Sequence, residues 1–154
     1  MGNATCAFVP IGPSGDGKAW APSNIYPSAV IGDEVSVGAF SEIGENVKIG
    51  DRTRVGAMSF IPEGFTIGKD VFIGPRFCGT NDKYPPSNRE SWLKTTIRDG
   101  ARIGAAVTIL CGVTIGEKAL IGAGSVVTRD VPAGETWCGV PARKIEHKEV
   151  VPCP

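Results

Sequence analysis

The sequence predicts an all-β protein of one main domain, a parallel β-helix built from six-residue repeats. Three observations predict it. An aliphatic residue recurs every six positions, glycine mostly follows it, and the fifth position of each repeat is small or β-branched. A fixed short period is typical of a solenoid, in which each repeat stacks on the previous one. The aliphatic positions are Ile25, Ile31, Val37, Ile43, Ile49, Val55, Ile61, Ile67, Ile73 and, after an interruption, Ile97, Ile103, Ile109, Ile115, Ile121 and Val127.

The repeat assigns each position to the inside or the outside of the coil. The aliphatic residue points inward, and a small or β-branched fifth residue suits a narrow interior and an extended backbone. Glycine at the second position lets the chain turn a corner without a Cβ clash. Three short strands and three corners then form one triangular coil, and coils stack about 4.8 Å apart. An α-helix is excluded because the period is six and glycine recurs throughout.

Segments without the period define the remaining organisation. Residues 1–24 are rich in Pro and Gly and are expected to form an irregular lead-in to a β-helix domain at 25–145. Residues 79–96 interrupt the repeat and should loop out of the prism. A long excursion from a regular scaffold is a candidate functional segment. Residues 146–154 form a polar tail.

Charge and composition exclude several classes of protein. Lys plus Arg and Asp plus Glu are both 16, so there is no basic excess for nucleic acid. No apolar run approaches the roughly 18 residues of a membrane helix, and the N-terminus does not resemble a signal peptide. The five cysteines are odd in number and widely spaced, which favours reduced thiols over disulfides or a zinc site. We therefore expect a cytoplasmic protein without a metal.

The end of the repeat carries a family resemblance. The hexads, the run at 121–134 and the sequence Gly139-Val-Pro-Ala-Arg143 resemble the left-handed β-helix acyltransferases over residues 25–145. The resemblance implies left-handed winding, acetyl-CoA as the acyl donor, and a homotrimer with active sites in clefts between neighbouring subunits. The outward positions of Met58 and Phe60 are candidates for the interface between subunits.

The interrupting loop resembles a narrower group. The run from Thr80 to Pro85, Thr-Asn-Asp-Lys-Tyr-Pro, with Trp92 further on, is similar to the loop of the sugar-nucleotide 3-N-acetyltransferases. These enzymes acetylate a 3-amino group on UDP- or dTDP-linked sugars for surface polysaccharides. One departure is Gly79, where an aromatic residue usually precedes the motif. Because Gly79 falls at an inward position, the start of the loop is expected to differ.

The resemblance gives the loop residues their roles. It places Asn81 at the reacting centre, where the amide could orient the amine or meet the developing oxyanion. Asp82 is a candidate to accept an amine proton or a sugar hydroxyl. Asn81 and Asp82 also suit a simple turn, since both side chains bond their own backbone. Lys83 and Tyr84 are candidate nucleotide contacts, or else solvated surface residues.

Coenzyme A needs small corners for its pantetheine arm and cations for its phosphates. By resemblance the arm lies along Ala105 and Ala123. Arg129, Arg143 and Lys144 lie toward the C-terminal end and are the candidate phosphate ligands, although each alone also suits a solvated surface.

The single histidine, His147, lies in the tail, so a histidine base is not expected. An amine near electron-withdrawing oxygens has a pKa of roughly 8, and a useful neutral fraction exists at pH 7 without a base. One histidine also excludes the three-histidine zinc site of the β-helix carbonic anhydrases. The sequence leaves two alternatives open. One is another amine or hydroxyl acceptor, such as a 4-amino sugar, and the other is a non-catalytic β-helix scaffold.

Overall fold

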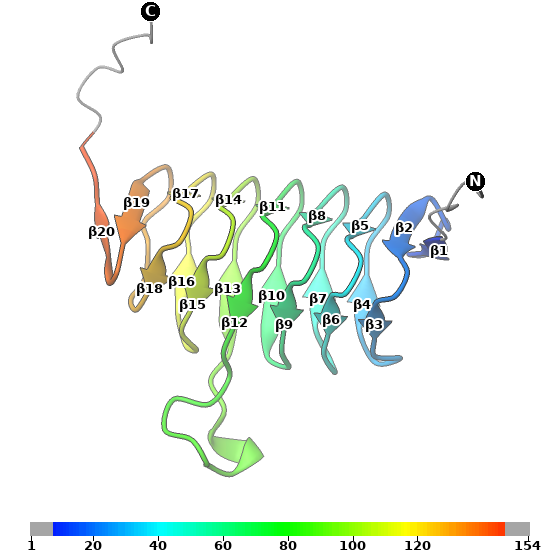
Figure 1. The fold of residues 1–154 in the computed structure, drawn as a ribbon, viewed down its shortest axis with the longest axis horizontal. Helices are drawn as coiled ribbons and strands as arrows, with labels where there is room; N and C mark the ends of the chain where they lie inside the picture. Colours follow the sequence, from blue (N-terminus) through cyan, green and yellow to red (C-terminus); the bar gives the residue numbers. More distant parts are fainter. Residues whose placement is uncertain (1–7, 147–154) are drawn as a thin grey trace, which may run out of the picture.

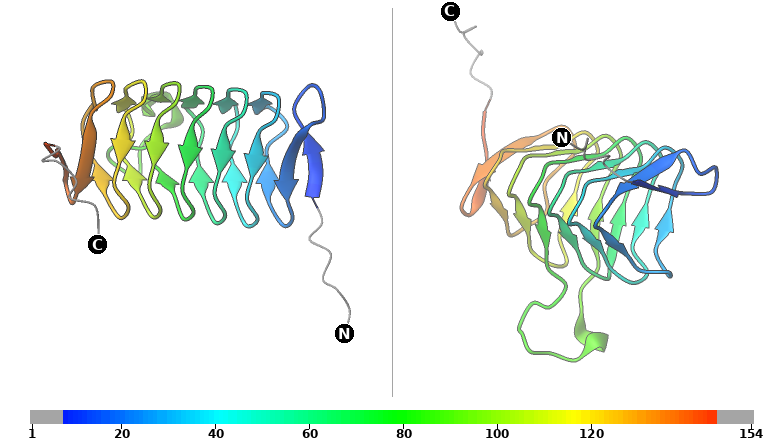
Figure 2. Two further views of the ribbon diagram at one scale, coloured as in Figure 1. Left: turned by 90° about the horizontal axis from the view of Figure 1, so that it is seen from above. Right: turned by 45° about the vertical axis from the view of Figure 1, so that its right-hand side comes forward.

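Residues 8–146 of the computed structural model form a prism of stacked coils with three flat faces (Figure 1). Within these residues the strands make three sheets, one on each face. All pairs between successive coils are parallel, which confirms the predicted β-solenoid and is consistent with the left-handed winding implied by the resemblance. Figure 2 shows the coils as successive rungs along one axis.

Each face draws one strand from each coil. Face 1 contains β1 (Phe8–Ile11), β2 (Gly17–Trp20), β5 (Ser36–Val37), β8 (Arg54–Val55), β11 (Phe72–Ile73), β14 (Arg102–Ile103), β17 (Leu120–Ile121), β19 (Thr136–Gly139) and β20 (Ala142–Lys144). Face 2 contains β3 (Asn24–Ile25), β6 (Glu42–Ile43), β9 (Phe60–Ile61), β12 (Cys78–Gly79), β15 (Thr108–Ile109) and β18 (Val126–Val127). Face 3 contains β4 (Val30–Ile31), β7 (Lys48–Ile49), β10 (Phe65–Ile67), β13 (Thr95–Ile97) and β16 (Thr114–Ile115).

The core is the column of aliphatic residues that the repeat predicts. Ile43, Ile73 and Ile103 are fully buried, each directly stacked on its equivalents in the next coils. Residues before them in each strand point outward, so Phe60 and Phe72 are exposed on faces 2 and 1. Burial of the aliphatic columns is the main stabilising term, because apolar area removed from water drives folding.

The corners explain why glycine follows the aliphatic residue. A Cβ on Gly38 would lie 2.4 Å from the backbone nitrogen of Ala57 in the next coil. Real Cβ atoms do not approach backbone so closely, so glycine is required by the stacking of coils. The left-handed backbone falls two positions later, at residues such as Asn46 (φ 57°), a residue type that tolerates this region.

The core departs from the repeat beside the interrupting loop. Phe65 and Phe77 occupy fifth positions that are small elsewhere, with their rings edge to face at 6.2 Å between centroids. A Cβ on Gly79 would lie 2.5 Å from Cζ of Phe65. The Phe65 ring therefore fills the volume that an aliphatic residue at position 79 would take, which explains the glycine at an inward position.

The two ends of the prism differ from the regular coils. Residues 8–20, expected to be part of an irregular lead-in, instead form an antiparallel hairpin of β1 and β2, and β2 continues face 1 by pairing with β5. At the other end β19 and β20 form a second antiparallel pair, and Trp137 is buried there against the core. Trp137 therefore covers the last coil.

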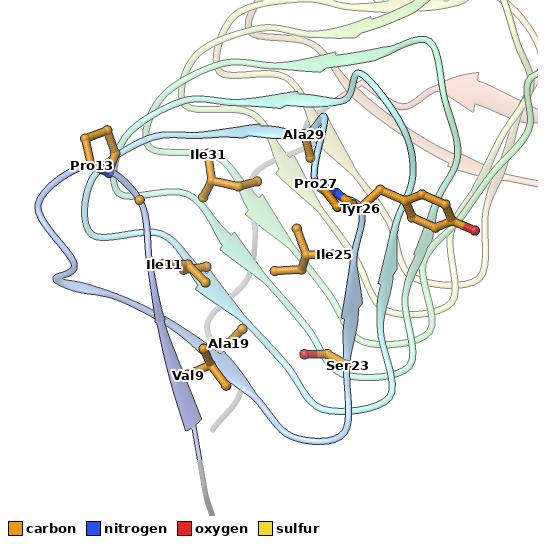
Figure 3. A pocket seen from close by; sticks show the side chains of 11 residues that line it. Val9, Ile11, Pro13, Ala19, Ser23, Ile25, Tyr26, Pro27, Ala29 and Ile31 are labelled. Carbon is orange, nitrogen blue, oxygen red and sulfur yellow. The ribbon is translucent and has the colours of Figure 1, made fainter.

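Among residues 8–146, the N-terminal end of the prism is hollow. A pocket of about 530 Å³ opens there and is lined mainly by apolar side chains, among them Ile11, Ile25 and Ile31 (Figure 3). These isoleucines point into the end of the prism and are only half-buried. None of the candidate site residues lines this pocket. No helix among residues 8–146 is long and apolar enough to cross a membrane.

Candidate active site

One loop projects from the prism, and it is the segment that interrupts the repeat (Figures 1 and 2). The chain leaves face 2 after β12 and returns to face 3 at β13, so the excursion is residues 80–94. It contains one 3₁₀ turn, Arg89–Ser91. The excursion is slightly shorter than the expected 79–96, because Gly79 still pairs with Ile109 and Thr95 pairs with Phe65.

Polar contacts hold the loop to the coils. At its neck the backbone nitrogen of Leu93 donates to the carbonyl oxygen of Asn81 at 3.0 Å. Nearer its tip, Nε of Arg89 donates to Oε2 of Glu63 at 2.7 Å, and its Nη2 also bonds Glu45. Glu45 and Glu63 belong to successive coils, so one guanidinium bridges the loop to two coils. Both carboxylates raise the pKa of Arg89 through these hydrogen bonds.

Asp82 fixes the shape of the loop from inside. Its carboxylate accepts hydrogen bonds from the backbone nitrogen of Tyr84 (3.0 Å), the backbone nitrogen of Ser87 (2.8 Å) and the Ser87 hydroxyl (2.7 Å). Desolvation acts to raise the pKa of Asp82, but the bonds from Ser87 and Tyr84 outweigh it and lower that pKa. A carboxylate with a lowered pKa and three donors is a poor proton acceptor. The geometry therefore supports the turn-forming alternative for Asp82.

A pocket of about 270 Å³ lies on one side of the loop, toward the N-terminal coils. We call it the aromatic pocket. Its charged groups are Arg89 with Glu45 and Glu63, and Glu42 on β6. The side-chain nitrogen Nε1 of Trp92 is buried and has no hydrogen-bond partner within residues 8–146. The aromatic and amide lining comes from Tyr26, Phe60, Asn81 and Trp92.

A second hollow of about 430 Å³ lies on the other side of the loop, toward the C-terminal coils. We call it the C-terminal cleft. Its charged groups are the cations of Lys83 and Arg129 and the carboxylates of Asp82 and Asp130, and Leu93, Leu110 and Cys111 form an apolar wall. The loop thus separates residues that the sequence grouped together. Asn81 lines the aromatic pocket, whereas its neighbours in the motif, Asp82 and Lys83, line the C-terminal cleft.

The other loop candidates are solvent-facing. The Tyr84 ring is 77% exposed, and the Lys83 ammonium lies 5.5 Å from its centroid. Neither side chain meets Asn81 in a common pocket. Lys83 is available to a ligand in the C-terminal cleft, which it lines, whereas Tyr84 lines neither hollow.

The candidate cofactor residues lie at two different edges of the prism. Ala105 and Ala123 occupy the corner between faces 1 and 2, in successive coils, since Gly124 donates to the Ala105 carbonyl at 2.8 Å. Arg129 follows β18 at the corner between faces 2 and 3, beside the loop. Within one chain, face 2 separates the alanines from Arg129, so they do not line one site.

Two further cofactor candidates lie on the terminal strand β20. Nζ of Lys144 pairs with Oε1 of Glu135 at 2.7 Å, and this hydrogen bond raises the pKa of Lys144. Nη1 of Arg143 donates to the Ala142 carbonyl at 2.8 Å, and its side chain is exposed. The structure brings both residues to the C-terminal end of face 1. His147 lies outside the described residues.

Sequence reasoning missed Glu42, Arg89 and the role of Phe65. Glu42, Phe60 and Cys78 pair in successive coils of face 2, and the loop begins two residues after Cys78. The hexad register alone could have found this column, because it fixes which outward residues stack. The sequence did not indicate the ion pairs of Arg89, because its partners Glu45 and Glu63 lie far away in the sequence. Residues 8–146 contain no group of three or more His, Cys, Asp and Glu placed to hold a metal ion.

Comparison with known proteins agrees with the repeat. The family model described as bacterial transferase hexapeptide (six repeats) matches residues 28–63 and 94–129, on both sides of the loop. A curated relative, the dTDP-3-amino-3,6-dideoxy-alpha-D-galactopyranose 3-N-acetyltransferase of Aneurinibacillus thermoaerophilus, is 52% identical over 54 residues. That match covers 35% of this chain and 28% of the relative. The chain spans less than a third of the length of the first curated relatives it matches.

Solved structures share the fold over most of the chain. PerB from Caulobacter crescentus, in complex with CoA and GDP-perosamine, superposes with a TM-score of 0.75 at 25% identity over 84% of this chain and 57% of PerB. AntD from Bacillus cereus, an N-acyltransferase in complex with dTDP and 3-hydroxybutyryl-CoA, superposes with a TM-score of 0.78 at 22% identity over 90% of this chain and 82% of AntD.

Proposed function

We propose, from the premise that this chain belongs to the hexapeptide-repeat transferase family, that it is an acyl-CoA-dependent N-acyltransferase. Its proposed acceptor is the 3-amino group of a nucleotide-linked amino sugar, used for surface polysaccharide. The observation that carries the proposal is the loop, which places Asn81 in the wall of a pocket beside the repeat. The named relative that acetylates a dTDP-linked 3-amino sugar supports the acceptor class.

The proposed reaction is direct transfer. The neutral amine attacks the thioester carbonyl carbon, a C–N bond forms, and the C–S bond breaks as coenzyme A leaves as the thiol. The nitrogen loses one proton, and the departing sulfur takes one up. Asn81 contributes either by donating its amide N–H to the oxyanion or by accepting from the amine. Asp82 takes no part as a base in this proposal, because its carboxylate is occupied.

The active site is proposed to need two copies of the chain. Ala105 and Ala123 lie at one edge of face 2, and the loop with Asn81 lies at the other. Copies arranged around a threefold axis can bring the alanine edge of one chain to the loop edge of its neighbour. A homotrimer would therefore join coenzyme and acceptor between subunits, and the exposed Met58 and Phe60 are candidates for that contact. Because acyl-CoA is an intracellular donor, we place the protein in the cytoplasm.

The test is thiol release from acetyl-CoA in the presence of UDP- and dTDP-linked 3-amino and 4-amino sugars. Asn81→Ala should lower kcat about 100-fold, the usual cost of losing one oxyanion donor. Asn24→Ala, an exposed asparagine on β3, is the matched control and should keep wild-type activity.

The outcomes separate the proposal from its rivals. Turnover with a 4-amino sugar alone would mean that the acceptor is a 4-amino group. If no sugar of the panel is acetylated but coenzyme A still raises the Tm, the protein is an acyltransferase with an acceptor that is not one of these sugars. If no sugar is acetylated and coenzyme A does not bind, the protein is a non-catalytic scaffold.

A further inference from the structure

The aromatic pocket has the size of a site for one ring. Its volume of about 270 Å³ lies just under the range of roughly 300–1,000 Å³ that holds drug-sized ligands. Loop residues Asn81 and Trp92 form one wall, and face 2 forms the other through Glu42 and Phe60. A whole nucleotide-linked sugar exceeds this volume, so only one part of such a ligand fits.

The charge of the pocket shows which part fits. Three carboxylates line it, and its one lining cation, Arg89, is bonded to Glu45 and Glu63. The third carboxylate belongs to the half-buried Glu42, and its oxygens make no hydrogen bond or ion pair with any group in the range 8–146. A surplus of negative charge repels phosphate. The pocket is therefore suited to hydroxyl or ammonium groups and unsuited to a diphosphate.

Two residues that line the pocket, Glu42 and Trp92, have a polar side-chain group without a partner within the described chain. The Glu42 carboxylate can only accept hydrogen bonds, and Nε1 of Trp92 can only donate them. The Trp92 nitrogen is buried, and a buried donor without a partner is unfavourable and rare in native proteins. Because Nε1 of Trp92 has almost no accessible surface, the Glu42 carboxylate is the acceptor that a ligand with hydroxyl donors would satisfy.

Aromatic side chains complete the site. Phe60 lies next to Glu42 across the β6–β9 pair, and Tyr26 and Trp92 also line the pocket. Flat aromatic surfaces suit the apolar C–H face of a sugar ring.

We propose that the aromatic pocket binds the sugar ring of the acceptor and that Glu42 determines specificity by accepting hydrogen bonds from ring hydroxyls. This inference rests on the proposed N-acyltransferase function. Asn81 then holds the amine at the loop side of the ring, and the diphosphate lies outside the pocket. The inferred substrate class is an amino sugar that keeps at least one ring hydroxyl remote from its amine.

The test combines variants of the protein with variants of the sugar. Glu42→Gln keeps the size of the side chain but removes its charge, and acceptors are compared in which ring hydroxyls are removed one at a time. Equilibrium binding of each acceptor is measured by calorimetry without acyl-CoA, and turnover is measured by thiol release. Glu34→Gln, at an exposed corner away from the pocket, is the control.

With the hydroxylated acceptor, Glu42→Gln should weaken binding and raise KM about tenfold while kcat stays constant, as expected for a contact equally strong in ground and transition states. With the acceptor that lacks the contacted hydroxyl, the same substitution should change little. Such non-additivity marks a direct contact.

Other outcomes overturn the inference. Equal effects of Glu42→Gln on all acceptors, or equal effects of Glu42→Gln and Glu34→Gln, would show that Glu42 contacts no ring hydroxyl. A wild-type protein that binds none of the acceptors would exclude a sugar site here. If wild type binds the acceptors through Glu42 but releases no thiol, the proposed function fails while the sugar site stands.

Discussion

The coils and the loop are held by opposite kinds of interaction. In the coils, columns of buried aliphatic side chains stack between parallel strands, and every coil repeats the same contact. In the loop, residues 80–94 contribute no fully buried side chain, and Arg89 and Asp82 provide most of the contacts through hydrogen bonds. Regions with few buried apolar contacts open most easily. We therefore expect the segment that carries the candidate chemistry to open more readily than the coils that hold it.

The largest expected effect is in the coils. Ile103→Ala removes a fully buried side chain from the middle of a column and should lower the free energy of unfolding by about 2–5 kcal/mol. Lys48→Ala, an exposed position on β7, should change it by less than about 0.5 kcal/mol. Urea unfolding followed by circular dichroism measures both. A small effect of Ile103→Ala would mean that the column is not the source of stability.

The next effect lies where coil and loop meet. Gly79→Val places a side chain against the Phe65 ring and should cost about 1–3 kcal/mol by overpacking. Adding Phe65→Val frees that volume, so the double variant should be more stable than the sum of the two single variants predicts. Strict additivity of the two changes in urea unfolding would contradict the assigned complementarity of Phe65 and Gly79.

The smallest effect on global stability is expected within the loop. Hydrogen bonds from Ser87 and Tyr84 lower the pKa of Asp82 in the folded protein below its pKa in the unfolded chain, which is about 3.9. Ionised Asp82 therefore makes its full contribution to the stability of the loop at pH values above the pKa of the unfolded chain. This contribution is lost as the pH falls through the folded pKa. Asp82→Asn should reproduce the loss at pH 7 by exposing the amides of Tyr84 and Ser87 to faster hydrogen exchange.

Coil amides should keep their protection in that variant, and the Tm should hardly move. Asp16→Asn, in the turn between β1 and β2, serves as the control. If loop and coil amides lost protection together, the two regions would form one cooperative unit and the contrast between them would be wrong.

The same contrast explains what the sequence predicts. The hexad period determines strands, faces and core, because each coil is built from contacts that recur at a fixed spacing. The hairpin at 8–20 carries no hexad and was expected to be irregular, although it continues face 1. In the loop, the motif identifies the segment but not the direction of each side chain. Asn81 and Asp82 point to different hollows because the turn that Asp82 forms with Ser87 decides their directions.

The outward residues that stack in successive coils could also have been predicted from the sequence. Glu42 and Phe60 lie side by side only because their coils stack, and that relation follows from the register of the repeat. Arg89 differs, because its two glutamate partners belong to coils that the loop folds back upon. Such a contact depends on the path of an irregular segment, which no period encodes.

The hollow at Ile25 and Ile31 marks the end of the prism at which further coils could be added. At that end strands β3 and β4 are the edges of faces 2 and 3, and the isoleucines beneath them have room above. An engineered coil of the same hexads, inserted ahead of residue 25, would find hydrogen-bonding edges and an apolar seat ready for it. At the opposite end Trp137 and the β19–β20 pair leave no such seat. The prism can thus be lengthened at its N-terminal end, while the loop and its pockets keep their distance from the C-terminal end.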